Sequence, residues 1–129
     1  MRLPLALSVL LALIPAAVAQ TAPEASGHWE GAISAPTQEL QILVDLAREA
    51  GVWKGTIGVP AQNLKAFPLS GIAVQGAKVH FAMAGIPGDP QFDGTLAADG
   101  KTLAGDWTQG GGAVPAKLSR TGEAKFAPV

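Results

Sequence analysis

Apolar and polar residues alternate along most of the chain from residue 28 onward. Three stretches share one order: an aromatic residue, a charged residue, glycine, a small residue and an aliphatic residue. They are residues 29–33 (WEGAI), 53–57 (WKGTI) and 92–96 (FDGTL), and residues 103–107 (LAGDW) have the same order in reverse. A period of two puts large apolar side chains and glycines on one face and polar side chains on the other. This pattern predicts half-buried antiparallel strands.

Turn residues recur about every ten residues, a spacing typical of all-β sandwiches and barrels. Asp99-Gly100 predicts a tight hairpin, and Gln75-Gly76 and residues 49–51 predict two more. Short successive connections favour an up-and-down meander, so we predict a single antiparallel β-barrel of about eight strands. The expected strands are residues 28–34, 39–47, 52–59, 66–74, 77–84, 90–97, 101–108 and 113–120.

Residues 38–50 fit two structures. A helix would have Thr37 as its N-cap and Gly51 at its C-terminus, with helix-forming residues between them. A strand is indicated by the alternation of Leu40, Ile42, Val44 and Leu46 with less apolar neighbours. We favour the strand because both neighbouring segments are strands, and antiparallel pairing needs a partner there.

The strand pattern also defines an inward face. Four glycines fall on it, and inward glycines mark either sharp bends at barrel corners or interior space for a ligand. They are Gly31, Gly55, Gly94 and Gly105. The large inward residues are Trp29, Ile33, Leu40, Ile42, Val44, Leu46, Trp53, Ile57, Val74, Val79, Phe81, Met83, Phe92, Leu96, Leu103, Trp107, Val114 and Leu118.

The first nineteen residues have the features of a secretory signal peptide. Arg2 precedes an apolar run over residues 3–15, and Ala17-Val18-Ala19 forms a cleavage site before Gln20. We therefore expect cleavage after Ala19 and export to a bacterial periplasm or the extracellular space. The expected organisation is a signal peptide (1–19), a flexible leader (20–27), the barrel (28–121) and a frayed tail (122–129). No later run is long and apolar enough for an integral membrane segment.

Charge and cysteine content exclude several classes of function. Without the signal peptide, which contains Arg2, the chain has eight basic and ten acidic residues, and they are dispersed along it. A chain without a basic patch is not expected to bind nucleic acid. The chain has no cysteine, so stability must come from the core rather than from disulfides, and no thiol nucleophile exists.

The polar residues do not form a pattern typical of catalysis or metal binding. His28 and His80 are the only histidines, and both fall on the outward face, where His28 and Glu30 make an ordinary surface pair. His28, Glu30, His80, Asp93 and Asp106 are too dispersed for a metal site. We therefore predict a protein that is not an enzyme, with no catalytic residue, no metal and no cofactor.

One cluster could serve a ligand. Aromatic side chains around a concave pocket are the usual form of a small-molecule site, but a small barrel also uses them simply to fill its centre. Both interpretations stay open at this point. The candidate ligand-binding residues are Trp29, Trp53, Phe81, Met83, Phe92 and Trp107.

The same segments resemble a known family. Residues 27–31 (GHWEG), 53–57 and 92–96, together with residues 67–70 (FPLS) and 103–111 (LAGDWTQGG), are similar to a small β-domain. That domain stands before the catalytic domain in exported bacterial α/β-hydrolases of the serine aminopeptidase or esterase type. The resemblance implies a lipocalin-like or calycin-like barrel in an accessory role. In those hydrolases a catalytic domain with a G-x-S-x-G motif follows the β-domain. The present sequence ends at residue 129 and contains no such motif.

Two functions follow as expectations. The first is an exported, non-enzymatic barrel that binds a small apolar ligand among its aromatic residues. The second, implied by the resemblance, is an accessory module that docks on an exported serine hydrolase encoded separately. A hydrolase remnant that has lost its catalytic domain is a further possibility under the same resemblance.

Overall fold

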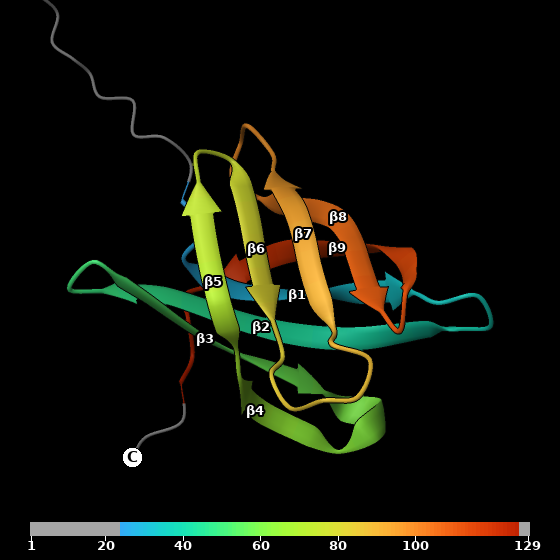
Figure 1. Ribbon diagram of the computed structural model, residues 1–129. Coiled ribbons are helices and arrows are strands. Elements are labelled where there is room, and N and C mark those ends of the chain that lie inside the picture. The colour runs from blue at the N-terminus through green and yellow to red at the C-terminus, as the bar shows by residue number, and fades with distance from the viewer. Residues whose placement is uncertain (1–23, 127–129) are drawn as a thin grey trace, which may run out of the picture.

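The computed structural model describes residues 24–126, which form nine antiparallel strands and one 3-10 turn (Figure 1). The strands pair in the order β4-β3-β2-β1-β9-β8-β7-β6-β5, so the sheet curls into a nearly closed up-and-down barrel. The predicted fold class is therefore confirmed. The elements are β1 (Gly27–Ser34), β2 (Glu39–Glu49), β3 (Val52–Val59), η1 (Pro60–Gln62), β4 (Leu64–Pro68), β5 (Ser70–Gln75), β6 (Lys78–Ala82), β7 (Gln91–Leu96), β8 (Thr102–Gln109) and β9 (Gly112–Gly122).

Nine strands appear where eight were expected, because the predicted strand at residues 66–74 is divided. Its first part belongs to β4, which pairs with β3, and its second part belongs to β5, which pairs with β6. Between them, the Leu69 backbone N–H donates to the Gly55 carbonyl at 2.9 Å. The chain therefore crosses from one edge of the curled sheet to the other at Leu69.

Residues 39–49 form a strand, as favoured from their alternation. This strand, β2, pairs with β1 on one side and β3 on the other, which is the pairing that a helix could not supply. The three expected hairpin turns are also present. Ala50, Gly76 and Gly100 have φ values of 53°, 60° and 72°, the left-handed conformation that tight hairpins need.

The predicted inward residues form the core. Most are buried, and the remaining ones (Leu40, Trp53, Val74 and Val114) pack half-buried against the others. Ala25, Val59 and Ala116 join the core in addition. The strands extend from Gly27 to Gly122, close to the predicted barrel bounds, whereas residues 1–23, with the expected signal peptide, lie outside the described residues. Over the described part of the chain, no helix has the length and apolarity needed to cross a membrane.

Arg120 of β9 closes one end of the barrel. Its guanidinium lies 4.9 Å from the Trp29 ring centre and donates to the backbone carbonyls of Glu24 and Ser26. The same side chain donates to the Gly100 carbonyl at 3.1 Å, in the turn between β7 and β8. One cation therefore joins the start of the fold, its last strand and a hairpin turn.

The loop between β6 and β7 covers the opposite end. Ile86 of this loop packs against the core, and the Met83 backbone N–H donates to the Pro90 carbonyl at 3.0 Å. The Gly110 N–H donates to the Gly88 carbonyl at 2.8 Å, which fastens the loop to the β8–β9 turn. Both ends of the barrel are thus covered by parts of the chain itself.

Two inward glycines lie where neighbouring strands approach unusually closely. A Cβ on Gly31 would stand 1.9 Å from the Lys117 carbonyl oxygen, and one on Gly105 would stand 2.0 Å from the Asp93 carbonyl oxygen. No side chain fits at such distances, so these positions accept only glycine. This geometry supports the interpretation of the inward glycines as barrel corners.

Gly105→Ala should therefore destabilise the barrel, because the new methyl group meets backbone atoms that cannot move aside. We expect a loss of about 2–3 kcal/mol in the free energy of unfolding, measured by urea denaturation. Gly112→Ala is the control, since its Cβ would have one neighbour, at 3.9 Å. Equal stability of the two variants would contradict the role assigned to Gly105.

Candidate functional site

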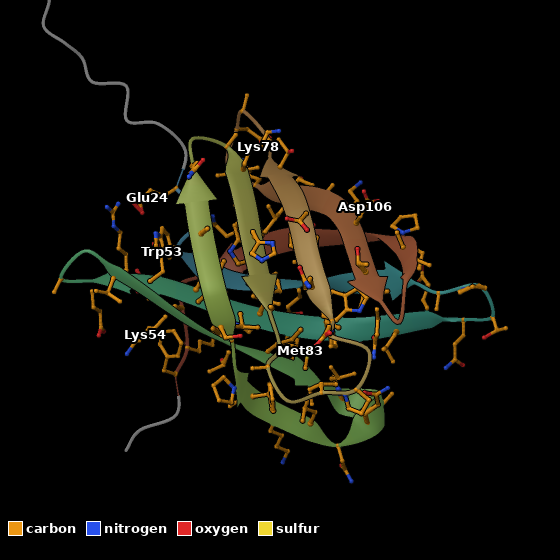
Figure 2. All side chains as sticks on the ribbon, viewed as in Figure 1. Glu24, Trp53, Lys54, Lys78, Met83 and Asp106 are labelled. Atoms are coloured by element: carbon orange, nitrogen blue, oxygen red, sulfur yellow. The ribbon has the colours of Figure 1, made fainter. Side chains whose placement is uncertain are left out.

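The aromatic residues predicted to bind a ligand lie inside the barrel. Phe81 and Phe92 are cross-strand partners whose rings stack with centres 5.1 Å apart, and Trp107 lies opposite Phe92 on β8. Trp29 on β1 is fully buried, whereas Trp53 on β3 is half-buried. Met83 is buried beside the loop that covers one end, where Figure 2 labels it.

Two of the three tryptophans in this set have hydrogen-bond partners within the chain. The Trp29 indole N–H donates to the Ala25 carbonyl at 2.9 Å, and the Trp107 indole N–H donates to the Gln109 side-chain oxygen at 3.2 Å. None of the three main pockets of residues 24–126 is lined by any of the six. Ligand binding by this interior set stays a prediction, and the surface of the barrel offers a second location.

A pocket of about 320 Å³ lies on the outer face of β1, β2 and β3. We call it the outer pocket. β4 and the 3-10 turn form one side, and the segment that follows β9 contributes Lys125; β4 and this segment both lie below β3 in Figure 1. Its lining residues are His28, Leu43, Asp45, Thr56, Gly58, Pro60, Leu64, Lys65, Ala66 and Lys125.

A histidine between two carboxylates stands at the β1 side of the outer pocket. His28 and Asp45 are direct cross-strand partners, and Nδ1 lies 2.6 Å from Asp45 Oδ1. The other ring nitrogen, Nε2, lies 3.0 Å from Glu30 Oε2, two residues further along β1. The imidazole therefore has one ring nitrogen toward each of two acidic side chains.

Burial distinguishes this cluster from the surface pair expected from the sequence. His28 points outward and contacts Glu30, as expected. Unlike a surface pair, however, His28 and Asp45 are each only 7% exposed. They are covered because β4 curls beneath β3 and the chain after β9 passes over Asp45. Alternation of residue types reveals which face a side chain takes, not what later segment covers that face.

The segment after β9 is fastened to the outer face. The Lys125 backbone N–H donates to Asp45 Oδ1 at 2.7 Å, and the Phe126 ring centre lies 4.7 Å from Lys54 Nζ. Figure 2 shows Trp53 and Lys54, neighbours on β3, on opposite sides of the strand. Residues 123–126 belong to the tail that was expected to fray, and residues 127–129 lie outside the described part.

The backbone beside the outer pocket is irregular. The β3–β4 pairing shifts register between Ile57 and Val59, and Gly58 at this bulge lines the pocket. On β4, Ala66 has φ 47°, a left-handed conformation that costs about 1 kcal/mol or more for alanine. Bulges and strained residues recur beside binding sites, where they redirect a strand or a side chain. Here they lie where β4 pairs with β3 at the edge of the sheet, beside the pocket.

A second His–Asp pair lies on the far outer face. His80 Nδ1 stands 2.7 Å from Asp93 Oδ1, and Asp106 is opposite Asp93 on β8. These residues line an open groove of about 490 Å³, but the His80 and Asp93 side chains are 33% and 64% exposed. Within residues 24–126, no three histidine or acidic side chains converge as metal ligands would. Water screens this second pair, so the outer pocket is the stronger candidate.

Comparisons with known proteins point to no functional residue, so the candidate site rests on its geometry. No family model, no curated protein and no solved structure matches the chain. The likeness to the hydrolase-associated β-domain therefore rests on the sequence motifs alone.

The two His–Asp pairs give a matched test of burial. We expect His28→Ala to lower the free energy of unfolding by about 3 kcal/mol, because it leaves the buried Asp45 carboxylate without its partner. His80→Ala, which breaks an exposed pair of the same type and strand relation, should cost about 1 kcal/mol or less. Urea denaturation of both variants measures the difference, and similar losses would refute the distinction.

Proposed function

We propose that this chain is a non-enzymatic binding module that holds a small apolar ligand in the outer pocket. The observation that carries the proposal is the composition of this pocket, where Leu43, Pro60 and Leu64 surround a buried His28–Asp45 pair. Mostly apolar walls with a few convergent polar groups are the usual form of a small-molecule site. Its volume of about 320 Å³ suits a ligand of several to a dozen non-hydrogen atoms.

A binding role fits the state of His28 better than a catalytic one. A general base must have a free nitrogen facing a nucleophile, whereas both nitrogens of His28 face carboxylate oxygens. The hydroxyl group in the pocket lining belongs to Thr56, and the lining contains no serine. These contacts support a site that recognises a molecule without transforming it.

The proposal includes the compartment indicated by the sequence. A chain with the leader features of residues 1–19 is expected outside the cytoplasm, in the periplasm or beyond. Apolar compounds are poorly soluble in these aqueous spaces. A small barrel that covers such a compound would act there as a carrier or as a sensor.

One observation favours the alternative of an accessory module that docks on an exported hydrolase. Val52, at the β2–β3 turn, is 66% exposed and is the only large apolar residue so exposed among residues 24–126. A single side chain is a small contact, so the outer pocket carries more weight. Co-purification of a serine hydrolase with the tagged chain, lost in Val52→Ser, would favour the docking role.

The binding role predicts that filling the outer pocket expels the ligand. A Cβ on Gly58 would lie 3.4 Å from the Leu64 carbonyl oxygen and 3.9 Å from Leu43, which are ordinary contacts. Gly58→Leu should therefore fold and occupy the pocket with its side chain. Native mass spectrometry of the protein purified from cells, before and after organic extraction, should show an extractable mass in the wild type alone.

Gly112→Leu is the matched control, since Gly112 is exposed and lines none of the three pockets. It should retain the extra mass. An extractable mass that survives Gly58→Leu would place the ligand elsewhere, with the interior aromatic residues as the next location to test.

A further inference from the structure

The Asp45 carboxylate has an oxygen without a hydrogen-bond donor. Oδ1 accepts from the His28 ring at 2.6 Å and from the Lys125 backbone N–H at 2.7 Å. None of residues 24–126 donates to Oδ2, although the Asp45 side chain is only 10% exposed. Asp45 also lines the outer pocket. The pocket therefore contains a buried acceptor whose partner the described chain does not supply.

A buried acceptor without a donor from the protein is an unfavourable arrangement unless a molecule in the pocket donates to it. Structural carboxylates avoid it by using both oxygens. A ligand that donates a hydrogen bond to Oδ2 would satisfy this oxygen. The polar part of the ligand is then a donor, held where the carboxylate faces apolar walls.

The charges of the lining decide between the possible donors. An ionised ligand carboxylate has no proton to donate, so it cannot satisfy Asp45 Oδ2. Lys65 and Lys125 also line the pocket, and neither ammonium forms an ion pair within the described chain, so a ligand ammonium would meet two like charges. A neutral hydroxyl can donate to Oδ2 and is not repelled by the two lysines. Because it also accepts, it can take a hydrogen bond from Thr56, the cross-strand partner of Asp45.

We infer that the outer pocket binds a small apolar alcohol, an inference that rests on the proposed binding function and adds the chemical class of the ligand. The alcohol hydroxyl donates to Asp45 Oδ2, and its hydrocarbon body packs against Leu43 and Leu64. An acid of the same shape has no proton to donate to Oδ2, and the two lysines disfavour an amine. Selectivity then comes from one oxygen atom and affinity from the apolar walls.

Three probes with one hydrocarbon body test the inference: cyclohexylmethanol, cyclohexanecarboxylate and cyclohexylmethylammonium. Each is titrated into the ¹⁵N-labelled protein, purified after expression of the complete chain, while backbone amide shifts are followed at Thr56, Gly58 and Ala66. We expect saturable shifts at these residues, with the alcohol bound at least about tenfold more tightly than either charged probe. Tenfold is what one well-placed hydrogen bond to a charged group is worth.

Asp45→Asn tests the oxygen itself, because it places an amide N–H₂ where Oδ2 stood. The preference for the alcohol over the carboxylate should fall by about tenfold. Asp93→Asn changes the exposed His–Asp pair in the same way and should leave the preference unchanged. Circular dichroism checks folding, and if Asp45→Asn is unfolded, Thr56→Val replaces it, with an expected loss of alcohol affinity alone.

The outcomes separate the two levels of the proposal. If a charged probe binds at these residues as tightly as the alcohol, the alcohol inference is overturned while the binding function stands. If no probe gives saturable shifts at these residues, both are overturned. If Asp45→Asn folds and keeps the full preference for the alcohol, the role of Asp45 is refuted.

Discussion

The close approach of paired backbones at glycine is the constraint on which the barrel depends. Where β1 meets β9 and β7 meets β8, the strands come so near that Gly31 and Gly105 have no room for a Cβ. The sheet can turn sharply there and close with few strands. A barrel closed so tightly has an interior that large side chains fill, as the fully buried Trp29, Phe81 and Phe92 show. The outer pocket lies on the other face of the sheet, between β4 and the segment after β9.

The sequence predicted the interior better than the surface. Alternation identified the inward residues, because an inward face must be continuously apolar whatever the strand order. The His28–Asp45 pair could also have been predicted. The expected strands end at Ser34 and begin again at Glu39, and a hairpin in that register places His28 opposite Asp45. From the sequence alone we pair His28 with Glu30 only, because two residues of one strand can be paired without knowing the strand register.

The segments that cover the His28–Asp45 pair could not be predicted from the sequence. Their arrangement needs the register shift beside Gly58, the left-handed Ala66 and the position of Lys125, contacts that alternation does not encode. Leu43 was a usable clue, because it is a large apolar residue on the outward side of β2. Outward leucines indicate that something covers the face. Which segment does so depends on distant contacts that only the folded chain supplies.

Two pairs of the same chemistry show how environment decides the role of a residue. His28–Asp45 and His80–Asp93 are both cross-strand partners joined through Nδ1 at nearly the same distance, 2.6 and 2.7 Å. Water reaches the second pair and weakens its electrostatic effect. The first pair is largely buried, so the Asp45 oxygen that no described residue satisfies faces a mostly apolar pocket. Residue type alone would have ranked the two pairs equally.

The contacts of Arg120 show that the barrel is completed by segments from the two ends of the described chain. This side chain binds the carbonyls of Glu24 and Ser26, which precede it by 96 and 94 residues. Hairpins such as β2–β3 and β7–β8 join neighbouring segments and can pair while the ribosome is still at work. The first strand must wait for its second partner until the last strand has been synthesised. Such distant pairings are slow to form, so we expect closure of the ring to be the slowest step of folding.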